Sequence, residues 1–418
     1  MPQRTDATRA SSSAASDVYT RPGLNPYAGT PRLWSLLVIL MPAVQVEHTL
    51  AFVDISTAFL QATESTPERV AVRLPQQLPT VPTLMPPWLT ATMGPNDWNR
   101  IREMAASTMP GDVRELDKAL YGLKNAPNLF VDHLRDVAKK NGYKTDEAEA
   151  VLLKTQPKGA TNALAHHIDD VVSSAHGPQA RQVLESIGED LDMGPIEELN
   201  TRETASVTYV GLQLDRHPEG IDVHQGTYVD GLQVPPLTGD TPYKRIPIVS
   251  AHDLREADEN EVNMDLQPIM RSLVGWLGWS VRTSPTWRVF FDLIARHSHK
   301  PCQRHITMLQ RILLWMKDMT AEKQLIRPVQ GNPRLAMFTD GGFESSTGTG
   351  RIGMVIRIVG EHWSPNNTET KPNNIIMFNT KRLKTKQISS SGPELLALLY
   401  GTKHIWSVLY LCRSLWGE

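Results

Sequence analysis

The order of apolar and polar positions predicts a chain that alternates between strands and helices. Residues 33–40 are apolar at most positions and predict a buried helix, while 49–55 predict a strand that runs directly into a helical turn. From about 127 to 141, apolar side chains recur at helical spacing, and Gly142 is a natural stop for that helix. Residues 75–98 contain six prolines and little periodicity, so we expect a long loop or insertion there.

The middle of the chain is rich in short apolar runs of the kind that form strands. They lie at residues 150–154, 164–168, 171–175, 207–214 and 221–224. Pro218-Glu219-Gly220 separates the last two runs and predicts the turn of a hairpin. Two adjacent aspartates separate the second run from the third and predict an acidic turn, and residues 179–191 predict a helix.

The two ends of the chain differ from this pattern. Residues 1–30 have few large apolar side chains and are interpreted as a flexible leader. Residues 233–265 are rich in proline and then in acid, which is typical of a connector, and 266–319 predict helices with many aromatic side chains. From residue 335 the pattern predicts strands, followed by one long apolar helix from 393 to 415.

Length and charge limit the possible classes of protein. A chain of 418 residues can form two or three domains that each bury a core, and 40% hydrophobic with 21% charged residues is ordinary for a folded protein. The net charge of −2 is weak support for nucleic-acid binding. Residues 301–418, however, hold 15 Lys and Arg against 8 Asp and Glu, so this basic portion is either a duplex-binding face or a solvated surface.

Cysteine usage and hydropathy predict the compartment. Cys302 and Cys412 are too few for a disulfide framework or a zinc site. The apolar stretch 33–44 is too short to cross a bilayer, and the N-terminus does not resemble a signal peptide. We therefore expect a cytoplasmic or nuclear protein in a reducing compartment, with no membrane segment.

Three aspartates stand where strands end and have the setting for metal-assisted phosphoryl transfer. Asp54 ends the strand of 49–55, and Asp169 and Asp170 lie side by side between two apolar runs. Clustered carboxylates repel one another unless cations neutralise them, which implies Mg²⁺ or Mn²⁺. Two such ions can activate an attacking hydroxyl and stabilise the leaving oxygen. The alternative is ordinary turn chemistry, which is the commoner reason for an Asp-Asp pair.

Five motifs in one order resemble the reverse transcriptase of copia-type LTR retrotransposon polyproteins. The most specific is Lys118-Ala119-Leu120-Tyr121-Gly122-Leu123-Lys124-Asn125-Ala126-Pro127, which is close to K-A-L-Y-G-L-K-Q-A-P. The others run from Asp54 to Leu60, from His167 to Asp170, from Tyr209 to Leu214, and from Arg271 to Pro285. They are similar to D-V-x-x-A-F-L, Y-V-D-D, F-L-G-I-x-V and R-S-x-x-G-S-L with T-R-P-D.

The resemblance implies a role for each residue that matches a motif. Asp54, Asp169 and Asp170 would bind two catalytic Mg²⁺ or Mn²⁺ ions, and Phe59 would lie under the incoming sugar and exclude a ribose 2′-hydroxyl. Tyr121, Gly122 and Pro127 would shape the floor under the templating pair and the nucleotide. From the residues alone, Phe59 is as well explained as a core side chain, and Gly122 as a turn glycine.

A second resemblance, to ribonuclease H, begins after residue 330. Asp340 follows an apolar strand and Glu394 lies in the first turn of the long helix, in the metal-binding places of Y-S-D-A-D and S-S-T-E-A-E-Y. A glutamate at a helix start is also favoured by the helix dipole alone. The chain stops at Glu418, before a third and fourth ligand would appear, so we expect no ribonuclease H activity.

Together the resemblances imply an α+β fold: a right-hand polymerase palm and fingers with a helical thumb or connection, then a truncated ribonuclease H-like α/β domain. The predicted segments are 1–30 (leader), 31–232 (fingers and palm, with incomplete fingers), 233–330 (connector and helical thumb or connection) and 331–418 (ribonuclease H-like). The partners would be an RNA or DNA template with a primer, and deoxynucleotide triphosphates.

The sequence also departs from the family pattern. His167 replaces a tyrosine, residues 1–47 contain no counterpart of the basic finger strands, and Arg32 is the only Lys or Arg between the leader and Asp54. The chain is therefore interpreted as a fragment or a decaying copy. Two alternatives to a polymerase stay open. One is an inactive relic that binds nucleic acid through the basic portion, and the other is a metal-dependent nuclease that uses Asp340 and Glu394.

Overall fold

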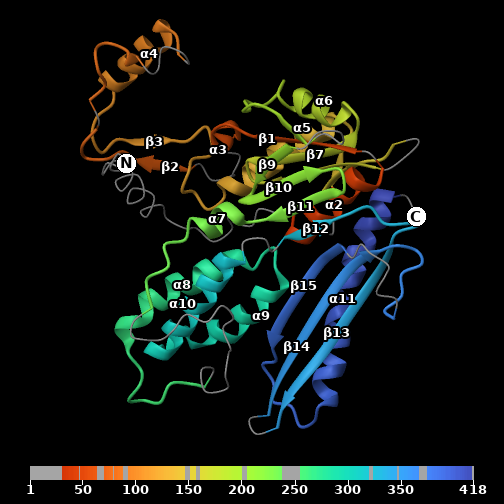
Figure 1. The fold of residues 1–418 in the computed structure, drawn as a ribbon. Helices are drawn as coiled ribbons and strands as arrows, with labels where there is room; N and C mark the ends of the chain where they lie inside the picture. The colour runs from red at the N-terminus through yellow and green to blue at the C-terminus, as the bar shows by residue number, and fades with distance from the viewer. Residues whose placement is uncertain are drawn as a thin grey trace. The chain divides into compact units, whose positions relative to one another are not determined.

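The structure is a computed structural model whose chain divides into two compact units. Figure 1 shows its helices and strands. The structure describes residues 31–46, 48–63, 70–78, 80–87, 93–145, 151–156, 161–199, 205–237, 255–319, 323–345, 348–366 and 374–416. The predicted leader, 1–30, lies outside the described residues. Of the described chain, Ser56–Val137 belongs to the first unit, and the second combines the chain up to Ile55 with everything from Ala138 onward.

The first unit contains short elements joined by loops. In chain order these are α3 (Ala58–Gln61), β2 (Ala71–Arg73), α4 (Pro95–Ala106), β3 (Val113–Glu115) and most of α5 (Ala126–Lys140). β2 and β3 pair as a two-stranded antiparallel sheet, and the N–H of Ala119 donates to the carbonyl of Ala62. The helix predicted from about residue 127 is confirmed as α5, and Gly142 follows it with φ of 82°.

The second unit is built around a six-stranded antiparallel sheet in the order β4-β5-β6-β7-β1-β8. The strands are β1 (His48–Asp54), β4 (Lys144–Thr145), β5 (Leu152–Lys154), β6 (Asn162–His167), β7 (Asp170–His176) and β8 (Glu197–Leu199). β1 and β7 are buried at nearly every position, so helices must cover both faces of the sheet. α2 (Leu33–Gln45) shares a core cluster with Leu50 and Phe52, and α6 (Gln179–Ile187) packs on the same two central strands.

A four-stranded antiparallel sheet follows, in the order β12-β11-β10-β9. Its strands are β9 (Ala205–Tyr209), β10 (Leu212–His217), β11 (Gly220–His224) and β12 (Gln324–Ile326). The prediction of one strand over 207–214 was wrong, because the chain reverses at Val210 and Gly211, with φ of 50° and 69°. Successive left-handed residues make the tight turn that the right-handed twist of a hairpin favours. The apolar pattern continues through this turn, which hid it from the sequence.

The helices predicted over 266–319 are confirmed and pack around one cluster of apolar side chains. They are η3 (Met264–Leu266), α8 (Gln267–Ser280), α9 (Pro285–Ile294), η4 (Ala295–His299) and α10 (Gln303–Asp318). The short helix α7 (Gly226–Asp230), which was not predicted, packs with them, and α7 to α10 together are called the helical segment. Trp287 lies in the centre of this cluster, and its ring meets that of Trp315 edge to face at 4.7 Å. Both cysteines of the chain are buried and free, as expected.

The chain then forms the predicted strands and long helix. The strands are β13 (Arg334–Glu344), β14 (Thr349–Val359) and β15 (Asn374–Arg382), paired antiparallel in that order, and the helix is α11 (Ser391–Trp416). α11 lies along one face of the sheet (Figure 1) and contacts β13 and β14. A Cβ on Gly401 of α11 would come within 2.5 Å of the Thr339 side chain, so helix and strand approach closely there.

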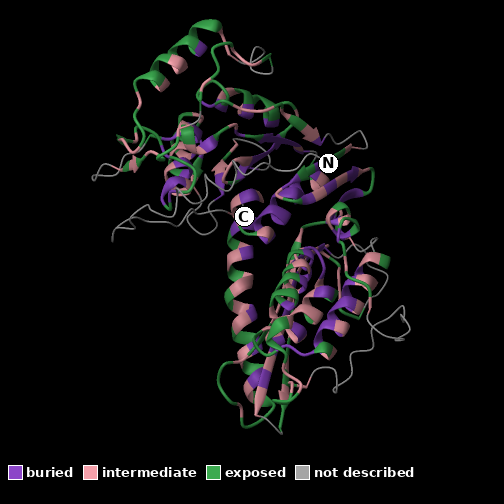
Figure 2. Ribbon diagram, turned by 90° about the vertical axis from the view of Figure 1, so that its left-hand side faces the viewer, coloured by how far each residue is buried: buried purple, intermediate pink, exposed green. Residues whose placement is uncertain are grey.

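Within the described residues, α11 is the helix that bears on the expectation of no membrane segment. It has the length and apolar composition to cross a bilayer, with 28% of its most apolar window buried. In Figure 2 most of this helix is intermediate or exposed. This is a weak indication, because the core helix of a folded protein passes the same test of length and composition.

Candidate active site

Asp54 and Asp170 lie opposite each other at one end of the central strand pair. Asp54 is the last residue of β1, Asp170 is the first of β7, and the antiparallel register pairs them. Residues directly opposite in such a ladder have Cα atoms about 4.5–5.5 Å apart and side chains on the same face. The sheet therefore gathers two carboxylates that are far apart along the chain.

Asp169 lies in the turn beside them. Ile168 and Asp169 join β6 to β7, and Ile168 has φ of 59°, a conformation that a β-branched residue rarely adopts. The N–H of Ile55 donates to the carbonyl of Asp169 at 2.9 Å, so the turn is fastened to the residue that follows Asp54. Backbone strain of this kind persists where surrounding contacts enforce it, and it is concentrated at functional sites.

The three carboxylates influence one another electrostatically. Burial and then the charge of Asp169 raise the pKa of Asp54 above its usual value. Burial, followed by the charges of Asp169 and Asp54, raises the pKa of Asp170, and His167 opposes this shift. Shifts with these causes require the carboxylates to be close enough to repel, which is the electrostatic condition under which a cation binds well.

The three aspartates have the right type of ligand atom for a divalent cation, but their side chains do not converge on one point in this structure. Within the described ranges, no three His, Cys, Asp or Glu side chains surround one point as metal ligands do. The aspartates nonetheless supply the hard oxygen donors that Mg²⁺ and Mn²⁺ prefer. Asp54 is exposed, and Asp169 and Asp170 are half-buried, so their carboxylates have space to turn toward a common ion.

Tyr209 supports Asp170 from the neighbouring sheet. It ends β9, and its hydroxyl donates to the backbone carbonyl of Asp170 at 3.3 Å. Its ring packs against Phe52 of β1 with centroids 5.6 Å apart. Burial raises the pKa of the Tyr209 phenol far above its usual range, so the hydroxyl keeps the proton that it donates.

The helical segment holds the turn that follows Tyr209. Arg282, just after α8, donates to the carbonyl of Val210 at 3.0 Å, and its guanidinium lies 4.5 Å from the centre of the Trp279 ring. A Cβ on Gly211 would come within 3.0 Å of Trp279, so the backbone and the indole are in close contact. A chain of contacts therefore runs from α8, through the β9–β10 turn, to the carbonyl of Asp170.

The four predicted substrate-binding residues belong to the first unit. There Phe59 of α3 packs against Tyr121, with ring centroids 4.7 Å apart. Gly122 has φ of 96°, a left-handed conformation that explains why glycine stands at this position. Pro127 is the second residue of α5, a place where its missing N–H costs no hydrogen bond. Phe59 and Tyr121 thus form one aromatic pair, and the assigned roles of all four residues stay predictions.

The backbones near Asp340 and Glu394 lie close together, but the two side chains point in different directions. A Cβ on Gly341 would come within 2.4 Å of the backbone nitrogen of Glu394, so β13 touches the first turn of α11 at Gly341. Neighbouring residues of a strand point to opposite faces, which places the Asp340 side chain on the face away from α11. Both acids are exposed, and their joint metal binding stays a prediction.

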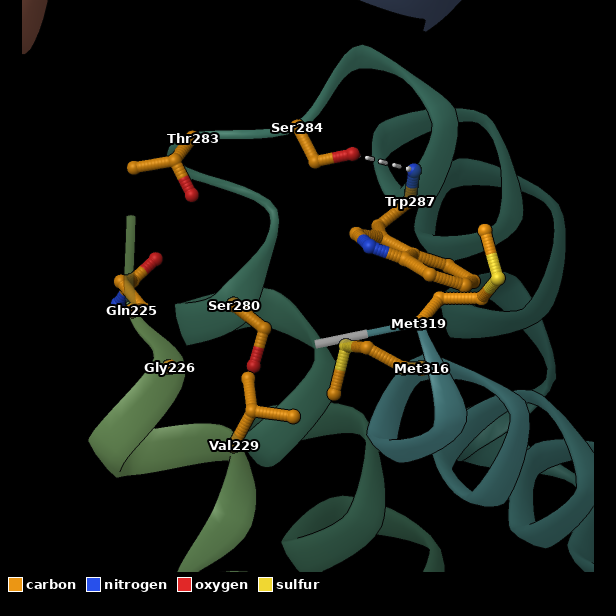
Figure 3. A pocket seen from close by; sticks show the side chains of 9 residues that line it. All are labelled: Gln225, Gly226, Val229, Ser280, Thr283, Ser284, Trp287, Met316 and Met319. Carbon is orange, nitrogen blue, oxygen red and sulfur yellow. Dashed lines mark hydrogen bonds between the residues drawn. The ribbon is translucent and has the colours of Figure 1, made fainter. Parts of the chain in front are cut away.

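The helical segment also contains a small cavity at the start of α9 (Figure 3). Ser284 caps α9 by accepting from the N–H of Trp287 at 3.4 Å, and the buried amide of Gln225 has no hydrogen-bond partner there. The cavity volume of about 20 Å³ suits roughly one water molecule, which the Gln225 amide would bind. A nucleotide cannot enter this cavity, so it is no candidate for the substrate site.

Comparison with known proteins finds similarity to proteins encoded by transposons. No protein-family model matches it. It is 23% identical over 216 residues to the retrovirus-related Pol polyprotein from transposon RE1 of Arabidopsis thaliana, and 22% identical over 216 residues to that of transposon RE2. It is 23% identical over 213 residues to the transposon Ty5-1 protein of Saccharomyces cerevisiae. This chain is a relative of copia-type retrotransposon Pol polyproteins.

The similarity to each of these three transposon proteins covers 50% of this chain. The chain itself spans 14% of the length of each Arabidopsis polyprotein and 65% of the yeast protein, which is less than two thirds of each. The motif resemblance is thus confirmed as a similarity to transposon-encoded proteins over half of this chain.

Sequence reasoning missed three residues of this Pol relative that support the site. Tyr209 was assigned only to a family strand, and the contacts of Trp279 and Arg282 were not foreseen. One signal was available: Gly211 in the middle of an apolar run indicates a turn or a close approach of another group. Nothing in the pattern says which residue makes that approach.

Proposed function

We propose that this chain is the reverse transcriptase part of a copia-type element, an RNA-directed DNA polymerase that uses two divalent cations. The observation that carries the proposal is the cross-strand pairing of Asp54 with Asp170, with Asp169 in the adjoining turn. The relationship to Pol polyproteins supports it independently of this geometry.

The same proposal extends to the fold. The six-stranded sheet with α2 and α6 corresponds to a polymerase palm, the helices α8 to α10 to a thumb or connection, and β13 to α11 to part of a ribonuclease H-like domain. Antiparallel pairing throughout the first sheet and the placement of the aspartates at one strand end support the palm assignment. The short elements of the first unit correspond to incomplete fingers.

Asp54, Asp169 and Asp170 would hold the ions, which when bound supply charge neutralisation for transfer of a nucleotide to the primer 3′-hydroxyl. The protein positions these carboxylates through the β1–β7 register, the strained Ile168 turn, and the hydrogen bond from Tyr209. Phe59 and Tyr121 would form the surface under the sugar of the incoming nucleotide, where an aromatic ring excludes a 2′-hydroxyl by its bulk.

Primer extension tests the proposal directly. The purified chain is incubated with a poly-A template, an oligo-dT primer and thymidine triphosphate, in Mg²⁺ or in Mn²⁺. We expect incorporation that depends on the cation and is lost when Asp169 and Asp170 are both replaced by asparagine. Equal incorporation by this double variant and the parent would refute the role of the aspartates.

A second candidate function is nucleic-acid binding without catalysis. It is favoured by the basic excess of residues 301–418 and by an aromatic position on the open face of the β13–β15 sheet. There Phe338 is 41% exposed, Arg357 lies over its ring at 5.3 Å, and Trp363 meets it edge to face. This function predicts salt-sensitive binding of single-stranded nucleic acid with no cation-dependent synthesis.

A further inference from the structure

A second cavity lies among α2, the junction of α8 with α9, and β15. Its volume is about 170 Å³. The wall is mainly apolar, with Leu37, Met377 and Phe378 among its side chains, and two arginines, Arg282 and Arg288, also line it. No acidic side chain takes part in the lining. The cavity is partly open to solvent. A mostly apolar hollow with positive charge on one side is a common design of a pocket for a small organic molecule.

Two of the residues that line this cavity carry buried donors without acceptors. The indole N–H of Trp34, a residue 5% exposed, and the Nε–H of Arg288 are both buried without a hydrogen-bond partner. Arg288 otherwise donates to the side-chain oxygen of Asn379 at 2.9 Å, and Arg282 to the carbonyl of Val210. In the described part of the chain, neither arginine forms an ion pair with a carboxylate. Buried donors in native proteins are almost always satisfied, so the two unpartnered donors indicate that an acceptor is missing beside them.

The chemistry and the size together define the missing group. Arginine binds carboxylates with two parallel hydrogen bonds, and the indole N–H can donate a third. A dry cavity of about 150 Å³ is known to admit benzene, so 170 Å³ leaves space for an aromatic ring with one small substituent. We propose that this cavity binds an amphipathic monocarboxylate of about benzoate size, its ring against the apolar wall and its carboxylate on Arg282, Arg288 and Trp34.

The proposed site is separate from the aspartates, and its test does not depend on polymerase activity. Benzoate is titrated into the full chain by calorimetry, with tryptophan fluorescence as a second readout because Trp34 lines the cavity. Benzamide has the same ring without the charge, and inorganic phosphate has charge without a ring. We expect benzoate to bind with Kd below about 1 mM and at least about 10-fold more tightly than either control.

Variants then assign the binding to the cavity. Arg288→Met removes the guanidinium and keeps much of the length of the side chain, and we expect it to weaken benzoate binding by roughly 10-fold to 100-fold. Trp34→Phe removes the unpartnered N–H and keeps an aromatic ring, with an expected loss of roughly 3-fold to 10-fold. Arg334→Met, at a side chain 62% exposed outside the cavity, serves as the matched control and leaves binding unchanged.

Three results would overturn the proposal. They are no benzoate binding at about 10 mM, equal binding of benzamide, and unchanged affinity in both Arg288→Met and Trp34→Phe. The first means that water alone fills the cavity, and the second that the arginines do not recognise charge. If Arg288→Met fails to fold by circular dichroism, the benzamide comparison and the Trp34→Phe variant still decide the question.

Discussion

Neutralising Asp170 should stabilise the folded protein at neutral pH while it removes the proposed activity. Asp170 faces Asp54 across the β1–β7 ladder, and its pKa is raised by burial and by the charges of Asp169 and Asp54. A carboxyl whose pKa rises on folding destabilises the folded state once it is ionised. The penalty is therefore absent below the unfolded pKa of 3.8 and grows as pH rises above that value. Asp170→Asn removes the penalty with little change in shape.

The expected magnitude follows from the strand register. Two unit charges about 5 Å apart repel by about 0.8 kcal/mol in water and by about 3 kcal/mol at an effective dielectric constant of 20. Asp54 is exposed, so solvent screens this pair and the lower end applies. A gain of roughly 1 kcal/mol corresponds to a rise in Tm of about 2–4 °C for a folded unit of this size.

Thermal melts at pH 7 and at low pH measure the effect. We expect Asp170→Asn to raise Tm at pH 7, to have no effect at pH 3.5, and to lose part of its effect in 1 M salt, which screens the charges of Asp169 and Asp54 but not the burial. Mg²⁺ at ten times its Kd should stabilise the parent by about 1.4 kcal/mol and the variant much less. Asp265→Asn, at an exposed acid in η3, is the matched control. A lowered Tm for Asp170→Asn at pH 7, or equal stabilisation of both proteins by Mg²⁺, would refute the reasoning.

Three further variants test other parts of the structure. Gly341→Ala would bring a Cβ within 2.4 Å of the backbone of α11. We expect it to lower the free energy of unfolding by about 1–3 kcal/mol in denaturant melts, whereas the control Gly342→Ala, with open space around it, should lower it far less. The pKa of Asp222 is lowered to about 2, chiefly by hydrogen bonds that outweigh its burial, so Asp222→Asn should cost about 1–2 kcal/mol at pH 7 and progressively less as pH falls from 4 toward 2. Arg282→Lys keeps the charge but loses the stacking on Trp279. We expect primer extension to show a lower kcat with little change in KM for the nucleotide. An unchanged kcat would mean that the β9–β10 turn does not depend on this contact.

Much of the local structure could be predicted because it depends on local patterns. The helical spacing of Phe130, Leu134 and Ala138 predicts α5, and the apolar runs on either side of Asp169 and Asp170 predict β6 and β7. Such periodicities report which face of an element is buried, and they need no knowledge of what buries it. They fail where a turn lies inside an unbroken apolar run, as at Val210 and Gly211.

The candidate site was predictable in its residue types but not in its geometry. The motifs identify Asp54, Asp169 and Asp170 as acids at strand ends, and the comparisons confirm the kinship with Pol polyproteins. The motifs do not contain the register that places Asp54 opposite Asp170, because register depends on which side chains both faces of the sheet must bury. They equally do not contain the side to which Asp340 points, since a shift of one residue along β13 would reverse it.

By itself, the amino-acid sequence determined the succession of strands and helices, the acids and aromatic residues available for chemistry, and the similarity to transposon Pol polyproteins. Only the tertiary structure decided that β1 pairs with β7, that Ile168 is held in a left-handed turn, and that Tyr209 and Arg282 connect the helical segment to Asp170. The physical reason is the distance along the chain between the residues that interact. Periodicity reflects contacts between neighbours in the chain, whereas register, backbone strain and buried hydrogen bonds arise only when distant segments pack together.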